Sequence, residues 1–396
     1  MNIQAVSPCN SCNYNPAHKA SYVTLCEKNY GERIAQDVIG NFNTKILPEL
    51  RKTAFIESRA LIKSAGAGRV IMNPEDYRSN VNFFTLAGGS GSRFSELAQA
   101  VGDYNKMNFP FKIGKDKDIH ILDFVLTMGK YFIEDTGVNT IMSSSQTGSF
   151  GDIISFYQTN AIKDTIVCCG DNVFGDSAFD IMGFFTKEIN NPNKHLALVG
   201  TVRTPEEVAK RFGVLEVEGA MSDEVLKLKI ISEKPELETA QALAIDGQNI
   251  ANTGLFYISK EAMEKLMAEI QSGANNIRKN DTEKYELADT IKYVHSMIPQ
   301  WFGRNSSEGA DVKIVEQWED VGEPKALYRC ADSVKKGLYI NDFPKKLRNN
   351  LRWSFAHRVH LDPESEYPYI NFSKSLQIAT KQFEDAKEVE GVNIII

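Results

Sequence analysis

The spacing of apolar residues divides the chain into two regions with different periodicity. Between about residues 34 and 50, apolar residues recur at steps of three and four, which is typical of an amphipathic helix. From Val81 onward, short β-type runs alternate with longer helical patterns. The clearest strands are expected at 81–86, 165–169, 196–202, 214–218 and 254–259, and the clearest helices at 121–137 and 260–273.

This alternation of strands and helices predicts an α/β fold with a largely parallel or mixed sheet. The change of pattern predicts an N-terminal extension at 1–80 that is partly helical, a principal domain at 81–330 and a C-terminal extension at 331–396. Ligands of open α/β sheets bind at the carboxyl ends of strands. The loops that follow the predicted strands are therefore the places where functional residues are expected.

Composition narrows the class of protein. The chain is 42% hydrophobic and 24% charged, with a net charge of −7, which argues against nucleic acid as the main partner. No apolar run is long enough to span a bilayer, and the first residues lack the pattern of a secretory signal. Only six of the 396 residues are cysteines, and Cys168 and Cys169 lie in an apolar run. We expect a cytoplasmic protein with buried, reduced thiols there.

A glycine-rich loop follows the first predicted strand. The segment FFTLAGGSGSRF spans residues 83–94, and its loop runs from Ala87 to Arg93. Glycine lets backbone N–H groups approach a ligand closely, and an arginine adds a fork of donors suited to phosphate oxygens. A dinucleotide fingerprint needs a third glycine where Phe94 stands, and the Gly-Lys-Ser/Thr of a P-loop is absent. The loop therefore predicts polyphosphate binding, with a tight turn without a ligand as the alternative.

The segments LAGGSGSRF and NKMNFP together resemble the signature of sugar-1-phosphate nucleotidyltransferases, in particular the bacterial glucose-1-phosphate nucleotidyltransferases. The stretch between Arg93 and Lys106 is longer than in the bacterial members. The resemblance implies that Arg93 and Lys106 are catalytic cations that hold the nucleotide phosphates. The nucleotide-binding positions that it implies in the loop are Leu86, Ala87, Gly88, Gly89, Gly91 and Ser92.

Further motifs follow in the order of that family. CCGDN and QWEDVGEP carry Asp171 and Asp320, which the resemblance makes the two ligands of a Mg²⁺ ion. SEKP carries Lys234, implied to be catalytic by aligning the sugar phosphate. The segment SSSQTGSFGDII lies where the family reads the nucleobase; Gln146 and Gly151 are its candidates, and a plain polar loop is the alternative. The implied sugar-binding residues are Gly213, Glu233, Asn252 and Gly254.

Taken together, the resemblance implies a Rossmann-like mixed sheet of the nucleotide-diphospho-sugar transferase type, with 81–330 as the catalytic domain. The implied reaction joins an NTP and a sugar 1-phosphate into an NDP-sugar and pyrophosphate with Mg²⁺ as cofactor. One alternative is a non-catalytic sensor or scaffold of the same fold that binds a nucleotide sugar, and another is a cytidylyltransferase with a non-sugar acceptor. The base, the sugar, the formation of a homo-oligomer and the role of residues 1–80 stay open.

The N-terminal extension raises a separate question of metal binding. Cys9, Cys12, His18 and Cys26 are residue types that bind zinc, but their spacing is irregular. A loosely packed leader segment is the alternative to a zinc site.

Overall fold

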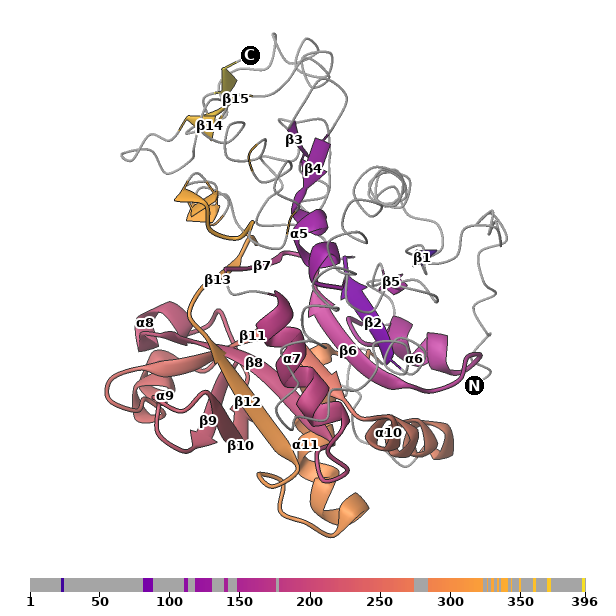
Figure 1. Ribbon diagram of the computed structural model, residues 1–396. Helices are drawn as coiled ribbons and strands as arrows, with labels where there is room; N and C mark the ends of the chain where they lie inside the picture. The colour runs from indigo at the N-terminus through magenta and orange to yellow at the C-terminus, as the bar shows by residue number, and fades with distance from the viewer. Residues whose placement is uncertain are drawn as a thin grey trace, which may run out of the picture.

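A nine-stranded mixed sheet forms the centre of the computed structural model (Figure 1). The structure describes residues 81–87, 118–129, 148–175, 178–273 and 284–322, with short segments at 23–24, 110–112 and 139–141 and separate positions and short strands between 326 and 395. In spatial order the strands are β1 (Val23–Thr24), β5 (Asn139–Ile141), β2 (Val81–Leu86), β6 (Asp164–Cys169), β11 (Asn249–Ile258), β8 (Leu196–Arg203), β12 (Ala310–Val315), β10 (Val225–Ser232) and β9 (Val214–Glu218).

Strand directions change at the middle of the sheet. Strands β1, β5, β2 and β6 are parallel to one another, whereas β11 is antiparallel to both β6 and β8. β12 runs parallel to β8, and β10 and β9 complete the far side with antiparallel pairing. β9 also pairs with β11, so this end of the sheet curls back on itself. The predicted mixed α/β sheet is confirmed.

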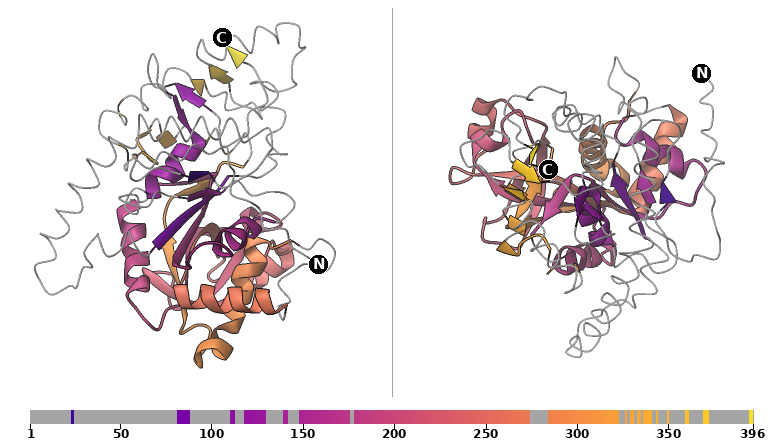
Figure 2. Two further views of the ribbon diagram at one scale, coloured as in Figure 1. Left: turned by 90° about the vertical axis from the view of Figure 1, so that its right-hand side faces the viewer. Right: turned by 90° about the horizontal axis from the view of Figure 1, so that it is seen from above.

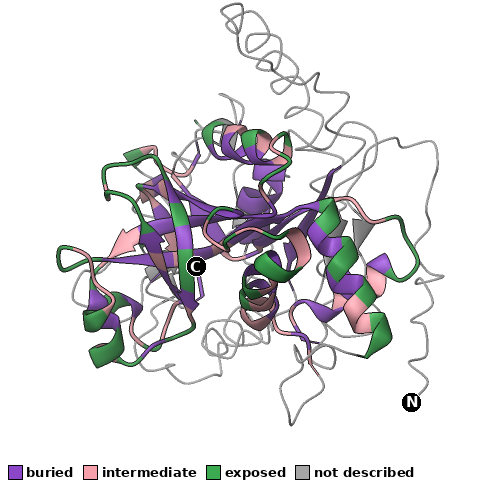
Figure 3. Cartoon of the chain, turned by 90° about the horizontal axis from the view of Figure 1, so that it is seen from below, coloured by how far each residue is buried: buried purple, intermediate pink, exposed green. Residues whose placement is uncertain are grey.

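Burial explains why the central segments form strands. All six residues of β2, VNFFTL, are buried, as are the first six of β8. Runs of apolar residues without alternation are typical of strands that are covered on both faces. Figure 3 shows the central strands as mostly buried, whereas the surrounding helices carry exposed outer faces. All five strands expected from the sequence are present, although β11 begins at Asn249, earlier than expected.

Helices cover both faces of the sheet (Figure 2). On one face α6, α10 and α11 pack over a core that includes Phe84, Val167 and Phe256. On the other face α7 packs through Phe185, whose ring lies 6.5 Å from that of Tyr257. The helices are α5 (Ile121–Met128), α6 (Gly151–Tyr157), α7 (Ala178–Ile189), α8 (Pro205–Val208), α9 (Leu237–Ala242), α10 (Lys260–Ser272) and α11 (Leu287–Phe302).

The caps of α10 show how local sequence fixes a helix. The Ser259 hydroxyl accepts a hydrogen bond from the backbone N–H of Ala262, and Gly273 ends the helix with a φ of 70°. This confirms the helix expected at 260–273. The helix expected at 121–137 begins at the predicted residue as α5, whose regular part ends at Met128, and residues 130–138 lie outside the described part of the chain. The helix expected near residues 34–50 also lies outside it.

Three small sheets accompany the large one. β7 (Asn172–Phe174) pairs with β13 (Trp318–Asp320), β3 (Pro110–Lys112) with β4 (Asp118–His120), and β14 (Val359–His360) and β16 (Ile394–Ile395) flank β15 (Tyr369–Asn371). Buried residues continue beyond position 330, since Val334, Ile340 and Phe343 are almost fully covered. Among the described residues, no helix is long and apolar enough to cross a membrane.

Candidate functional site

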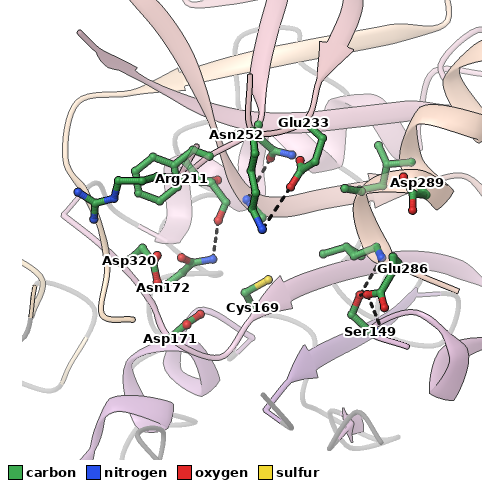
Figure 4. A pocket seen from close by; sticks show the side chains of 18 of the residues that line it. Ser149, Cys169, Asp171, Asn172, Arg211, Glu233, Asn252, Glu286, Asp289 and Asp320 are labelled. Carbon is green, nitrogen blue, oxygen red and sulfur yellow. Dashed lines mark hydrogen bonds and ion pairs between the residues drawn. The ribbon is translucent and has the colours of Figure 1, made fainter. Parts of the chain in front are cut away.

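A cavity of about 490 Å³ opens at the carboxyl end of β6, beside the irregular middle of β11 (Figure 4). Segments that are far apart in the sequence line it, from the β6–β7 turn to β13. Seven of the residues that the sequence singles out lie on its wall. They are Asp171, Gly213, Glu233, Lys234, Asn252, Gly254 and Asp320.

The backbones of the two aspartates lie close together because β7 and β13 form an antiparallel ladder. Asp320 lies opposite Asn172 in this ladder, and Asp171 is the residue before Asn172. The backbone N–H of Val321 donates to the carbonyl oxygen of Asp171 at 2.8 Å. Both carboxylates therefore belong to the same end of one short ladder and line the same cavity.

Glu233 and Lys234 approach the cavity from the loop after β10. The Glu233 carboxylate lies over Gly213, where an added Cβ would come within 2.9 Å of Oε2. Lys234 Nζ lies 3.8 Å from Glu233 Oε1, and its side chain is 59% exposed. Lys234 also has a φ of 44°, a left-handed conformation that is uncommon for residues other than glycine. Residues in this conformation tend to cluster at active sites and ligand-binding segments.

β11 contributes Asn252, Thr253 and Gly254 to the wall of the cavity. Its pairing with β8 shifts register between Asn252 and Phe256, so its backbone bulges at Thr253 and Gly254. Gly254 has a φ of 74°, and an added Cβ would lie 2.9 Å from Cys169 Sγ. The Asn252 side chain accepts a hydrogen bond from the Gly254 N–H at 3.0 Å. Only glycine fits this position without displacing its neighbours.

The end of the cavity away from the aspartates contains residues that the sequence did not single out (Figure 4). The Ser149 hydroxyl donates to Glu286 Oε2 at 2.9 Å and accepts from the Leu287 N–H at 2.7 Å. Glu286 is the N-cap of α11, where the helix dipole favours a negative charge, and Asp289 lies in the first turn. Acidic residues at the start of a long amphipathic helix are a sequence signal that could have found Glu286 and Asp289, whereas Ser149 is identified only by its contacts.

One expectation about the cysteines is corrected by the structure. Cys168 is buried, and burial raises the pKa of its thiol well above the usual range. Cys169 is not fully buried and lines the cavity. The difference arises because successive side chains of a strand point to opposite faces, and Cys169 is the last residue of β6.

The start of the glycine-rich loop lies beside the aspartates. Leu86 and Ala87 are buried at the end of β2, where Leu86 pairs with Cys169, and the Gly170 N–H donates to the Leu86 carbonyl at 2.7 Å. Gly151 is the buried first residue of α6 and is not one of the residues that line the cavity. The remaining candidates lie outside the described residues: Gly88, Gly89, Gly91, Ser92, Arg93, Lys106, Gln146, and the zinc candidates Cys9, Cys12, His18 and Cys26.

The described residues include no cluster of three or more histidine, cysteine, aspartate or glutamate side chains placed to hold a metal ion. Asp171 and Asp320 offer two carboxylates on one wall of the cavity. Such a pair suits Mg²⁺, which is usually bound by one or two carboxylates while substrate phosphates and water complete its shell. The donor set therefore fits a magnesium ion whose remaining coordination positions would be filled by water or by substrate phosphates.

A family model described as nucleotidyl transferase matches residues 133–337, just over half of the 396 residues. The match begins after the glycine-rich loop and includes the aspartates and SEKP. A comparison with curated protein sequences gives no match.

Solved structures of several transferases are similar to the chain at low sequence identity. UDP-glucose pyrophosphorylase complexed with UDP-glucose is 13% identical, with a TM-score of 0.45, over 65% of this chain and 98% of that one. Mannose-1-phosphate geranyltransferase from Thermus thermophilus is 14% identical, with a TM-score of 0.42, over 63% of this chain and 78% of that one. The inositol-1-phosphate CTP transferase from T. maritima is 15% identical, with a TM-score of 0.39, over 70% of this chain and 96% of that one.

Proposed function

Since the chain belongs to the nucleotidyl transferase family, we propose that its cavity transfers a nucleotidyl group from an NTP to a sugar 1-phosphate. The products are an NDP-sugar and pyrophosphate. The observation that carries the proposal is that one cavity collects the aspartate pair, Lys234 and the sugar-side residues Glu233 and Asn252 from separate parts of the chain. Their side chains have the chemistry that two phosphorylated substrates require.

In the proposed reaction an oxygen of the sugar phosphate attacks the α-phosphorus of the NTP. The bond from the α-phosphorus to the oxygen that bridges to the β-phosphate breaks, and pyrophosphate leaves with the electron pair. The substrates supply both the nucleophile and the leaving group, so the protein needs no covalent intermediate. Positioning and charge stabilisation can account for catalysis of this kind.

Asp171 and Asp320 are the residues that would hold Mg²⁺. When bound, the ion would supply positive charge that offsets the phosphate oxygens of the two substrates. The ladder between β7 and β13 fixes the backbones of both aspartates. Without a cation these two carboxylates would repel the NTP, so their joint presence on the wall supports a metal-dependent reaction.

Lys234 is proposed to align the sugar phosphate. Its side chain is 59% exposed and extends from the loop that also carries Glu233, so it can reach an anion in the cavity. Glu233 and Asn252 offer oxygen acceptors and an amide donor for sugar hydroxyl groups. Glu286 and Asp289 extend this polar lining to the far end of the cavity, which suits a polyhydroxylated acceptor.

The NTP phosphates are proposed to bind at the glycine-rich loop. Ala87 directly follows β2, and Gly170, next to Asp171, is hydrogen-bonded to Leu86. The loop therefore leaves the sheet beside the aspartates. Arg93 and Lys106 would then hold the departing pyrophosphate.

A pyrophosphate-release screen tests the proposal. Four NTPs are each combined with Mg²⁺ and a panel of sugar 1-phosphates, with phosphocholine as a non-sugar acceptor. We expect at least one NTP and sugar 1-phosphate to release pyrophosphate together and neither to do so alone. Release with phosphocholine only would change the acceptor class. Binding of NDP-sugars without any release would favour the non-catalytic sensor.

A further inference from the structure

The geometry points to Asn172 as a positioning residue that holds the aspartate pair at a fixed place relative to β11, the strand that carries Asn252 and Gly254. This inference rests on the proposed function, because it assigns Asn172 a role in forming the metal site. Asn172 itself is only 3% exposed and makes its contacts with the protein rather than with solvent. Its side chain lies between the aspartates and β11 in Figure 4.

The amide of Asn172 connects three strands. Its Nδ2 donates to the backbone carbonyl of Thr253 in β11, and its Oδ1 accepts from Trp318 Nε1 in β13 at 3.1 Å. Asn172 itself belongs to β7. The two-stranded β7–β13 sheet is separate from the nine-stranded sheet, so this side chain ties the small sheet to the large one.

Trp318 is a firmly held partner. Trp318 is 3% exposed, and its ring packs edge-on against that of Phe212 with the ring centroids 5.0 Å apart. Arg203 lies over the ring at 5.7 Å and donates from Nη2 to the Trp318 carbonyl at 2.6 Å. Because Trp318 is only two residues before Asp320, a hydrogen bond that fixes its indole also fixes the strand of the second aspartate.

β11 is shaped to receive the amide. The register shift after Asn252 places the Thr253 carbonyl where it accepts from Asn172, while the Thr253 hydroxyl donates to the Val199 carbonyl at 2.8 Å. Gly254 leaves room for the same amide, since an added Cβ would lie 3.2 Å from Asn172 Nδ2. Thr253 and Gly254 thus line the cavity and also make room for the Asn172 side chain.

The chemistry of the two contacts requires an amide. One partner is a carbonyl, which needs a donor, and the other is an indole N–H, which needs an acceptor. Among side chains of this size only asparagine offers both, because aspartate cannot donate when ionised and leucine can do neither. Loss of the amide would leave the Thr253 carbonyl and the Trp318 N–H without this partner and release the β7–β13 ladder from β11.

The test is a titration of the full chain with Mn²⁺ alone, in which EPR measures the concentration of free Mn²⁺. Because no substrate is present, the titration reports on the aspartate site without turnover. We expect Asn172→Ala to raise the dissociation constant on the order of tenfold, the scale seen when supports of metal ligands are removed. Trp318→Phe, which keeps a ring but deletes the N–H, should raise it in the same direction. The double variant should resemble Asn172→Ala, because both changes break one connection.

Asn249→Ala is the matched control. Asn249 is also buried on β11, and its amide donates to the Ala240 carbonyl at 3.0 Å, away from the cavity. Asn249→Ala should lower the melting temperature and leave Mn²⁺ binding unchanged. This result would show that a general loss of stability does not by itself weaken metal binding.

The variant Asp171→Asn distinguishes failure of the metal site from failure of the positioning role of Asn172. If Asp171→Asn weakens Mn²⁺ binding while the dissociation constants of Asn172→Ala and Trp318→Phe stay within twofold of wild type, the positioning role is wrong and the metal site is supported. If Asn172→Ala does not fold, Trp318→Phe alone decides between these results. If Asp171→Asn binds Mn²⁺ as tightly as wild type, both the metal site and the positioning role are wrong.

Discussion

The carboxylate of Glu233 lies directly over Gly213, so close that a Cβ at Gly213 would come within 2.9 Å of Oε2. The Gly213 carbonyl also accepts a hydrogen bond from the Asn252 N–H at 2.8 Å, so the backbone there is fixed. The side chains of Glu233 and Asn252, both proposed to bind the sugar, therefore lie next to Gly213, which has no side chain of its own.

Gly213→Ala should displace the Glu233 carboxylate and weaken use of the sugar 1-phosphate. The backbone of Gly213 is not left-handed, so alanine fits the chain and only the carboxylate must move. We expect the KM for the sugar 1-phosphate to rise on the order of tenfold, since small misplacements of a binding group are costly. The KM for the NTP should stay unchanged in steady-state kinetics.

Gly183→Ala is the control for this substitution. Gly183 lies in α7, and an added Cβ would meet nothing within 4 Å. Its kinetics should match those of wild type, and helix propensity should favour the alanine. An unaltered KM for the sugar 1-phosphate in Gly213→Ala would show that Glu233 does not bind the acceptor.

Lys234→Gly should lose acceptor binding while keeping the local backbone. Glycine adopts the left-handed conformation of residue 234 without strain, so this variant removes the charge and leaves the φ of 44° accessible. The expected loss in kcat/KM for the sugar 1-phosphate is about 1.5–3 kcal/mol, the scale of a hydrogen bond to a charged group. Calorimetry should show NTP affinity close to that of wild type. Lost NTP affinity with normal acceptor affinity would assign Lys234 to the nucleotide.

Sequence patterns predicted the sheet well where strands are continuous apolar runs. The segment VNFFTL became β2 with the expected bounds, because a short continuous apolar run is typical of a strand that is buried on both faces. The motif residues Asp171 and Asp320 were also found in one cavity, since each lies at a strand end of the same ladder.

The rest of the site depends on contacts between distant segments. Ser149 and Glu286 meet because the Phe150 N–H donates to the Tyr285 carbonyl at 2.8 Å, and no local pattern encodes that contact. Asn172 is inconspicuous in the sequence for the same reason, since its partners come from β11 and β13. Cys169 was expected to be buried, but hydropathy does not show that the last residue of a strand faces a cavity.

Glu188→Gln should make stability less sensitive to pH. Glu188 lies in α7 and is 6% exposed, and its Oε2 has no hydrogen-bond partner within the described part of the chain. Burial, reinforced by the charge of Asp311, raises its pKa from 4.5 to about 7. The folded state therefore holds this proton more tightly than the unfolded state, so its contribution is present below pH 4.5 and is lost as the pH rises through 7.

Urea unfolding at pH 5 and pH 8 measures this effect. Because glutamine stays neutral, Glu188→Gln should be more stable than wild type at pH 8, by about 3 kcal/mol at most. The difference should shrink at pH 5. Glu264→Gln on α10, whose side chain is 49% exposed, is the control and should show little change at either pH. Equal pH dependence in wild type and Glu188→Gln would show that Glu188 ionises normally.

The most direct test of a metal-dependent transfer at the aspartate pair is a Mg²⁺ titration of pyrophosphate release. It compares wild type with Asp171→Asn, Asp320→Asn and the double variant, all nearly isosteric. We expect each single variant to lose turnover on the order of 10²–10³-fold, the scale for one preorganised electrostatic group. The double variant should lose much less than the product of the two, because both residues would serve one ion. Wild-type turnover at an unchanged Mg²⁺ midpoint in either single variant would contradict the site proposed for this chain.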